Sequence, residues 1–272
     1  MKIGVDIGGT KIRAGLVDQA AVVRDVITEP CPASMGKEDI LSAIIGIIGR
    51  LVTDEVDLIG FGVPAIVDKE GVVYECVNIP SWDRVDLKGR MESEFGIPVV
   101  VNNDCNCFVR GVARSSYGMG CRDIVGITLG TGVGAGLYLN EELYSGQNSC
   151  AGEIGCMRYK DKDYESYCSS QFFANLGTTA MDEAFKARSG DEDSLLLWKE
   201  FGENVGNLIN MVTLACDPQV VMLGGGISSA FDLFEPSMRG CMARFPYTQV
   251  VSNIKIFSDP SGDFMLVGAV MC

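Results

Sequence analysis

Two glycine-rich turns, each set between two short apolar runs, constrain the fold of this chain more than any other feature. Residues 2–7 alternate apolar and other side chains as a half-buried strand does, Gly8-Gly9-Thr10 break the pattern, and alternation resumes through residue 17. The same order recurs about 120 residues later around Gly130-Thr131-Gly132-Val133-Gly134. A turn without Cβ atoms lets backbone N–H groups approach a phosphate. One such turn alone is more often a plain hairpin, but the recurrence predicts two related halves, each with one phosphate-binding hairpin.

The charge balance limits the kinds of partner. The 272 residues carry a net charge of −14, which argues against a protein that binds the phosphate backbone of nucleic acid. An anionic ligand would therefore have to be held locally, by backbone amides and a metal ion. No run of 18 apolar residues is present, so we expect no membrane span. The chain opens directly on a predicted strand without the pattern of a signal peptide, and we expect a cytoplasmic protein.

The side-chain inventory limits the chemistry. The sequence contains no histidine, which removes histidine general bases and histidine metal ligands. Its eleven cysteines are scattered and form no C-x-x-C pair, so we interpret them as reduced thiols that mostly fill the core. Proton transfer near neutral pH would then depend on aspartate or glutamate.

The remaining pattern alternates strands with helices and indicates an α/β protein. Apolar spacing predicts strands at 21–28, 57–63, 97–101, 219–223 and 251–257, and helices at 37–52, 86–95, 105–117, 165–187, 194–216 and 262–271.

Asn102-Asn103-Asp104 lies where the strand at 97–101 gives way to a helix. Ligands in such folds bind beyond the carboxyl ends of strands, so a carboxylate here is well placed for proton transfer. Asp and Asn are also the usual N-caps of helices. The two interpretations are compatible, because one of the three residues can cap the helix while another serves in catalysis.

Six segments, in this order, resemble motifs of the ROK family of sugar kinases and their regulator relatives, within the actin/hexokinase/Hsp70-like ATPase superfamily. They are two phosphate motifs, a sugar-site segment, a conserved loop, the segment of the catalytic aspartate and an adenosine motif: Asp6–Lys11, Gly62–Ala65, Asn78–Trp82, Val101–Asp104, Thr128–Gly134 and Leu223–Ser228. The resemblance covers essentially the whole chain. It implies two actin-like (ribonuclease H-like) halves with mixed five-stranded sheets flanked by helices, and an active site in the interdomain cleft. The expected domains are residues 1–110 plus 258–272 and residues 111–257.

The resemblance also implies the site residues. ATP and Mg²⁺ would be bound by Asp6, Gly8, Gly9, Thr10, Lys11, Gly130, Thr131, Gly132, Gly134, Gly224, Gly225 and Gly226. The sugar would be bound by Pro64, Ala65, Asn103, Asp104, Glu153, Cys156 and Glu165. Asp104 would accept the proton of the attacking hydroxyl, and Asp6 would hold Mg²⁺ through water.

The chain departs from the family pattern on the sugar side. Ala65 stands where the family usually has glycine, and Cys156 stands where it has histidine. The cysteine-rich zinc loop is shortened to residues 157–164 and holds no cysteine, so we predict no structural zinc. Packing of three tyrosines in this region would have to support the loop instead: Tyr159, Tyr164 and Tyr167.

The expected activity is ATP-dependent phosphorylation of a hexose or N-acetylhexosamine, with a small-molecule sugar as partner. The motifs do not specify the sugar. The alternative is a non-catalytic sugar sensor, because a sugar contact is lost with the histidine. We expect no DNA-binding domain in such a sensor, because the phosphate hairpin begins at residue 2. A chaperone-like or acetate-kinase-like ATPase of the same superfamily is less favoured. A homodimer follows only from the resemblance.

Overall fold

A computed structural model of the chain describes residues 1–76 and 78–271. The chain forms two compact units, one of Met1–Met119, Ser145–Ala151 and Gly262–Cys272, the other of Gly120–Tyr144 and Gly152–Ser261. The domain bounds expected from the sequence, 1–110 plus 258–272 and 111–257, stay a prediction.

The first unit is built on a mixed five-stranded sheet with the strand order β3-β2-β1-β4-β8. The first three strands are antiparallel, whereas β4 and β8 run parallel to β1. Their bounds are β1 Lys2–Ile7, β2 Lys11–Val17, β3 Val23–Pro30, β4 Leu58–Val63 and β8 Val99–Asn103. The hairpin expected at residues 2–17 is therefore confirmed, with Ile7 opposite Ile12 at its end.

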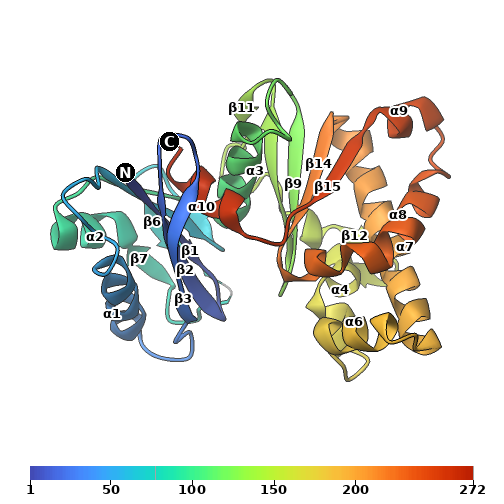
Figure 1. The fold of residues 1–272 in the computed structure, drawn as a ribbon, viewed down its shortest axis with the longest axis horizontal. Coiled ribbons are helices and arrows are strands. Elements are labelled where there is room, and N and C mark those ends of the chain that lie inside the picture. Colours follow the sequence, from blue (N-terminus) through green and yellow to red (C-terminus); the bar gives the residue numbers. More distant parts are fainter. Residues whose placement is uncertain (77, 272) are drawn as a thin grey trace. The chain divides into compact units, whose positions relative to one another are not determined.

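Helices cover both faces of this sheet (Figure 1). Helices α1 (Lys37–Ile48) and α2 (Leu87–Phe95) lie on one face, where they bury apolar side chains from alternate positions of β1 and β4. This core includes Ile3, Val5, Ile7, Ile40, Ile44, Ile47, Ile59, Phe61, Leu87 and Met91.

Helices α3 (Asp104–Arg114) and α10 (Asp263–Ala269) pack on the other face, against glycines. A Cβ on Gly4 or on Gly60 would collide with backbone atoms of α10, and one on Gly111 of α3 would do the same. The backbone of the last helix thus lies directly on β1 and β4.

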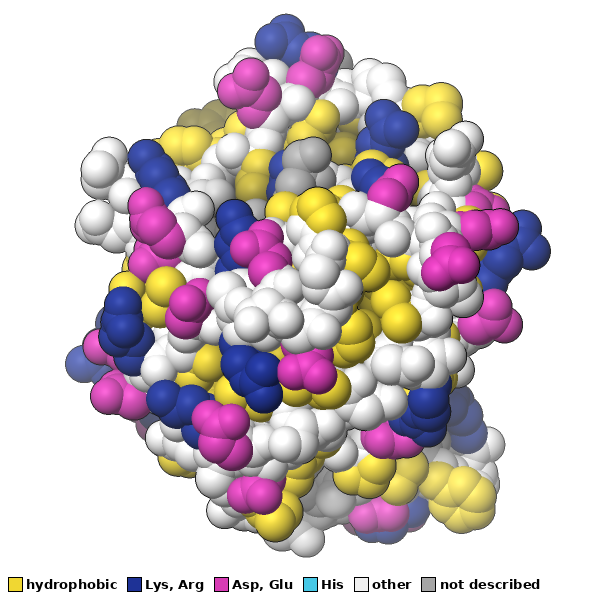
Figure 2. All heavy atoms as spheres, turned by 90° about the vertical axis from the view of Figure 1, so that its left-hand side faces the viewer, with side chains coloured by type: hydrophobic (Ala, Val, Ile, Leu, Met, Phe, Trp, Pro, Cys, Tyr) yellow, Lys and Arg dark blue, Asp and Glu magenta, His cyan; other side chains and the backbone are white. Residues whose placement is uncertain are grey.

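A small antiparallel sheet completes the first unit, and its order is β5 (Ile66–Val67), β6 (Val72–Tyr74) and β7 (Arg84–Asp86). Figure 2 shows one face of the molecule, on which lysine and arginine side chains are interspersed with aspartates and glutamates.

The second unit repeats the topology of the first. Its sheet has the order β11-β10-β9-β14-β15, with antiparallel pairing among the first three strands and parallel pairing of β14 and β15. The bounds are β9 Ile124–Leu129, β10 Val133–Leu139, β11 Glu142–Leu143, β14 Val220–Gly224 and β15 Lys255–Ser258. The prediction of two related halves with mixed five-stranded sheets is confirmed.

Two long helices, α7 (Glu192–Cys216) and α8 (Phe231–Met242), pack tightly against each other in the second unit. Gly202 and Gly206 of α7 leave room for the backbone of α8, and a cluster of aromatic rings fills the space beside them. The rings belong to Phe172, Phe173, Trp198, Phe201 and Phe234. No helix in the described part of the chain combines the length and apolar character needed to cross a membrane.

The single helix expected at residues 165–187 is wrong. The segment forms three short helices, α4 (Tyr164–Cys168), α5 (Ser170–Ala174) and α6 (Ala180–Arg188). Ser169 and Thr179 each cap a new helix, and Gly177 takes a φ of 74° that ends the turn before Thr179. Of the apolar positions that suggested one helix, three are exposed: Leu176, Met181 and Phe185.

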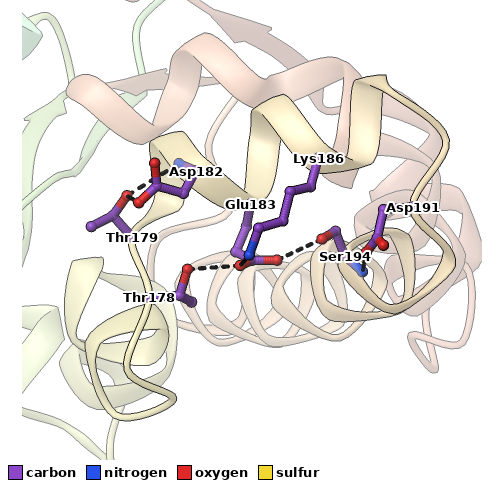
Figure 3. A network of polar contacts seen from close by, with 7 residues as sticks. All are labelled: Thr178, Thr179, Asp182, Glu183, Lys186, Asp191 and Ser194. Carbon is purple, nitrogen blue, oxygen red and sulfur yellow. Dashed lines mark hydrogen bonds and ion pairs between the residues drawn. The ribbon is translucent and has the colours of Figure 1, made fainter.

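A buried carboxylate fixes α6 to the start of α7 (Figure 3). Glu183 accepts hydrogen bonds from Thr178 Oγ1 at 2.7 Å, from Lys186 Nζ at 2.7 Å and from Ser194 Oγ at 2.6 Å. These bonds lower the pKa of Glu183 to about 2, with Lys186 as the largest contribution. Only 8% of its side chain is exposed, so the carboxylate is a buried charge with its partners in place.

One smaller expectation also fails. The strand expected at 251–257 begins only at Lys255, and helix α9 (Thr248–Asn253) precedes it. The shortened loop at residues 157–164 holds a tight hairpin of β12 (Arg158–Tyr159) and β13 (Lys162–Asp163). Two 3₁₀ turns complete the second unit, η1 (Ile154–Cys156) and η2 (Gly226–Ala230).

Candidate functional site

The first glycine turn is a tight connection between β1 and β2. Gly8 N–H donates to the carbonyl of Lys11 at 2.9 Å and closes the turn. A Cβ on Gly9 would lie 2.8 Å from both the Cβ and the carbonyl oxygen of Asn78, so the position requires glycine. Thr10 and Lys11 are exposed beside the turn. Backbone amides and a hydroxyl can therefore reach a ligand here.

Asp6, at the end of β1, is an aspartate with an unusual pKa. Desolvation by burial, followed by the negative charge of Asp104, raises this pKa from 3.8 to about 7, while Lys11 and Arg13 oppose the rise. The side chain still reaches solvent in part. Burial also raises the pKa of Asp104, against hydrogen bonding at Cys105. The first unit thus holds two partly buried carboxylates that repel each other.

At the junction of β8 and α3, one residue caps the helix and the next offers a carboxylate. Asn103 is the N-cap of α3, and its Oδ1 accepts from the N–H groups of Cys105 at 2.9 Å and Asn106 at 3.2 Å. Asp104 is the first helical residue, and its Oδ1 accepts from Cys105 N–H at 2.8 Å. Because Asn103 caps the helix, Asp104 is not required for that purpose.

Parallel pairing of β4 with β8 brings the predicted sugar residues of the first unit together. Val63 lies opposite Asn103 in this register, so the chain after β4 and the start of α3 meet at the same edge of the sheet. Asn103 Nδ2 donates to the carbonyl of Ala65 at 3.4 Å, and Cys76 Sγ lies 3.7 Å from the carbonyl of Pro64.

The second glycine turn is a similarly tight connection, between β9 and β10. Gly130 N–H donates to the carbonyl of Gly132 at 3.0 Å, and Leu129 lies opposite Val133. Thr131 is exposed at the tip.

The glycines after β14 lie at the same sheet edge as this turn, since Gly224 pairs with Thr128. Gly225 has a φ of 83°, and a Cβ there would collide with the carbonyl of Leu129. Its own carbonyl accepts from Ser228 Oγ at 2.7 Å, which starts η2. Gly226 is exposed beside it. Gly226 therefore leaves exposed backbone next to the second turn, whereas Gly224 is buried.

Glu153 precedes η1 and Cys156 is its last residue, and both residues are exposed. Glycines hold this segment against β10, because a Cβ on Gly152 or Gly155 would collide with carbonyls of that strand. Glu165, in α4, is partly buried and has two partners in its own unit. Its Oε2 accepts from Val133 N–H at 3.1 Å, and its Oε1 accepts from Gln171 Nε2 at 2.9 Å.

Sequence reasoning missed Gln171 and Ser170. Ser170 donates its N–H to the carbonyl of Gly130 at 2.8 Å and lies with its hydroxyl 3.4 Å from the carbonyl of Thr131. The available signal was Ser169, a helix N-cap type in the middle of an apolar run, which marks the start of a new helix.

The three tyrosines expected to support the shortened loop do pack together. The rings of Tyr159 and Tyr164 stack at 4.4 Å, and Tyr167 meets Tyr159 edge-on at 5.6 Å. Lys160 Nζ lies over the rings of Tyr159 and Tyr167, at 5.4 and 4.6 Å from their centroids. Tyr167 also donates to Asp161. Residues 1–76 and 78–271 contain no group of three or more Cys, Asp or Glu that could hold a metal ion; the absence of a structural zinc stays a prediction.

Two α/β units of one topology, each with a glycine turn between its first two antiparallel strands, define a protein of the actin-like class. A sequence model described as the ROK family matches residues 2–269, and the chain belongs to that family. The resemblance stated from the six motifs is therefore confirmed.

Three relatives illustrate this similarity. A glucokinase of Thermotoga maritima is 26% identical over 291 aligned residues, which cover 95% of this chain and 92% of the relative. An N-acetyl-D-glucosamine kinase of Vibrio vulnificus is 29% identical and covers 88% of each chain. The crystal structure of a ROK family glucokinase from Streptomyces griseus, in complex with glucose and AMPPNP, superimposes with a TM-score of 0.87. It is 27% identical and covers 99% of this chain and 98% of that one.

Proposed function

We propose that this protein is an ATP-dependent sugar kinase that transfers the γ-phosphoryl group to a hydroxyl of a hexose or N-acetylhexosamine. The observation that carries the proposal is Asp104, a partly buried carboxylate with a raised pKa at the end of β8, where Asn103 has taken over the capping of α3. Kinase relatives that cover nearly the whole chain support it.

Asp104 would accept the proton of the attacking hydroxyl. A general base works best when its pKa is close to the working pH, and burial moves the pKa of Asp104 in that direction. Asn103 Nδ2, which reaches the carbonyl of Ala65, would hold a neighbouring hydroxyl together with the backbone at Pro64 and Ala65. Glu153, Cys156 and Glu165 would bind the remaining hydroxyls; each oxygen of Glu165 can accept a second hydrogen bond.

The two glycine turns would hold the ATP phosphates through N–H groups and the hydroxyls of Thr10 and Thr131, and Lys11 would add a positive charge. Gly224, Gly225 and Gly226 would bind the adenosine, with the exposed backbone of Gly226 open to it. Phosphoryl transfer depends mainly on such positioning and on electrostatics.

Asp6 fits a role in holding Mg²⁺ through water. Its pKa is raised by burial and by the charge of Asp104, so a nearby cation would relieve an unfavourable pair of carboxylates. Oxygen ligands and retained water are what Mg²⁺ prefers. The bound ion would supply charge neutralisation on the transferred phosphate.

The test is a coupled assay of ADP release across a panel of hexoses and N-acetylhexosamines, with Asp104→Asn as the variant. We expect the variant to lose a factor of about 10²–10⁴ in kcat while it keeps its affinity for an ATP analogue. Asp25→Asn, an exposed aspartate of β3, is the matched control and should leave both unchanged. Unimpaired turnover by Asp104→Asn, in a folded protein, would refute the assignment.

The second candidate is a non-catalytic sugar sensor, and Cys156 in place of the family histidine favours it. Calorimetry with the same sugar panel separates the two, because sugar binding without turnover in the presence of ATP supports the sensor. The interdomain active site, the domain bounds and the homodimer stay predictions under either candidate.

A further inference from the structure

Residues Glu165–Gln171, here called the clamp segment, bind the second glycine turn through several polar groups. Ser170 N–H donates to the carbonyl of Gly130 at 2.8 Å, and Ser170 Oγ lies 3.4 Å from the carbonyl of Thr131. Glu165 Oε2 accepts from Val133 N–H at 3.1 Å. The clamp segment therefore contacts three of the four peptide units that follow Leu129, from one chain stretch more than 30 residues away.

These contacts decide which way the amides of the turn point. In a trans peptide, the C=O and the N–H of one unit point in opposite directions. The carbonyls of Gly130 and Thr131 face Ser170, so the N–H groups of Thr131 and Gly132 point away from it. Two successive N–H groups on one side of a turn form the kind of nest that binds an anion.

The next peptide unit is fixed in the opposite sense. The carbonyl of Gly132 accepts from Gly130 N–H across the turn, which directs Val133 N–H outward to Glu165. Gln171 Nε2 donates to the other carboxylate oxygen at 2.9 Å and holds Glu165 in this position. A Cβ on Gly132 would collide with Glu165 Oε2, so the carboxylate lies directly against the turn.

We propose that the clamp segment sets the phosphate-binding face of the second glycine turn, with Ser170 and Glu165 as positioning residues that aim the N–H groups of Thr131 and Gly132 at the polyphosphate of a nucleoside triphosphate. The proposal rests on the proposed function for the identity of the ligand, but not for the orientation of the amides. Because Glu165 is also one of the residues expected to bind the sugar, it would connect the second glycine turn to the sugar.

Ser170→Pro is a selective test, because it deletes the N–H that binds Gly130 and spares the helix. Ser170 is the first residue of α5, where proline is favoured, and Ser169 before it has φ −119° and ψ −173°, which proline allows. Ala180→Pro is the matched control, since Ala180 is the first residue of α6 and Thr179 before it has φ −123° and ψ 153°.

We expect Ser170→Pro to raise KM for ATP about tenfold, with KM for the sugar unchanged and the melting temperature close to that of Ala180→Pro. Ser170→Ala keeps the N–H and removes the weaker contact, so its KM for ATP should rise about twofold at most. Glu165→Gln should raise both KM values, because its carboxylate serves both sides. Equal KM values for ATP in the two proline variants, with normal turnover, would overturn the proposal.

A second measurement keeps the inference separate from the kinase assignment. Pyrophosphate is titrated into ¹⁵N-labelled wild-type protein and into Ser170→Pro, and the amide resonances of Thr131 and Gly132 are followed. The proposal is supported if pyrophosphate shifts these two resonances in the wild type and binds about tenfold more weakly to the variant. This holds even if no sugar is phosphorylated. The absence of shifts at both amides in the wild type contradicts it, even if the protein is a kinase.

Discussion

Replacing Glu183 by glutamine should destabilise the second unit in a pH-dependent way. The substitution keeps the size of the side chain but removes the charge that Thr178, Lys186 and Ser194 surround (Figure 3). The fall in the pKa of Glu183 from 4.5 to about 2 corresponds to about 3 kcal/mol. Because the Lys186 side chain is 53% exposed and solvent screens the pair, we discount this to about 1.5 kcal/mol.

The sign follows from the direction of the pKa change. A carboxylate whose pKa is lower in the folded state stabilises the fold above its unfolded pKa of 4.5, and this contribution disappears as the pH falls toward about 2. The difference in unfolding free energy between wild type and Glu183→Gln should therefore be full at pH 7 and shrink steadily below 4.5.

Urea unfolding followed by the fluorescence of Trp198, which is buried in α7, measures this difference at several pH values. Asp182→Asn is the control, because Asp182 neighbours Glu183 on α6 but is exposed and accepts a hydrogen bond from Thr179 Oγ1. Its effect should stay below about 0.5 kcal/mol at every pH. A loss for Glu183→Gln that is the same at pH 3 as at pH 7 would refute the electrostatic reasoning.

Gly60→Ala and its control Gly46→Ala test the packing of the first unit, and Tyr159→Leu tests that of the second. Gly60→Ala should cost about 2–3 kcal/mol in thermal unfolding because its Cβ meets the carbonyl of Ala269, whereas Gly46→Ala, with open space around it in α1, should be neutral or stabilise by up to about 1 kcal/mol. Tyr159→Leu removes the stack on Tyr164 and should speed hydrogen exchange in the β12–β13 hairpin by about tenfold. EDTA should leave the melting temperature of the wild type unchanged. A lower melting temperature in EDTA would instead indicate a structural metal.

Local signals were sufficient to predict the strands of the sheets and the junction of β8 with α3. Alternation over residues 2–17 and the apolar runs at β4, β8, β9 and β14 each identify a strand without reference to the rest of the chain. Asn and Asp at the start of α3 likewise have short-range partners, so the capping of this helix by Asn103 could be anticipated, whereas the catalytic role of Asp104 stays a prediction.

The errors occurred where a distant partner decides the structure. β15 begins at Lys255 because it pairs with β14, whose first residue, Val220, lies opposite Lys255. The run at 165–187 has enough apolar residues for one helix, yet the capping of Ser169 and Thr179 and the contacts of Glu165 and Ser170 with the turn divide it. The contacts of Glu165 and Ser170 depend on tertiary placement, which no periodicity in the sequence encodes. The caps at Ser169 and Thr179 are local, and their residue types were a signal in the sequence.

Helix α10 has a consequence for how the protein is made. Its backbone lies directly on β1 at Gly4 and on β4 at Gly60, so the layer that α3 begins on this face of the first sheet stays incomplete until residues 263–269 are made. A ribosome synthesises the whole second unit before it reaches them. The first unit, although it is begun first, is therefore expected to be completed last, and its exposed β1–β4 surface is what a chaperone would have to shield while the chain is being synthesised.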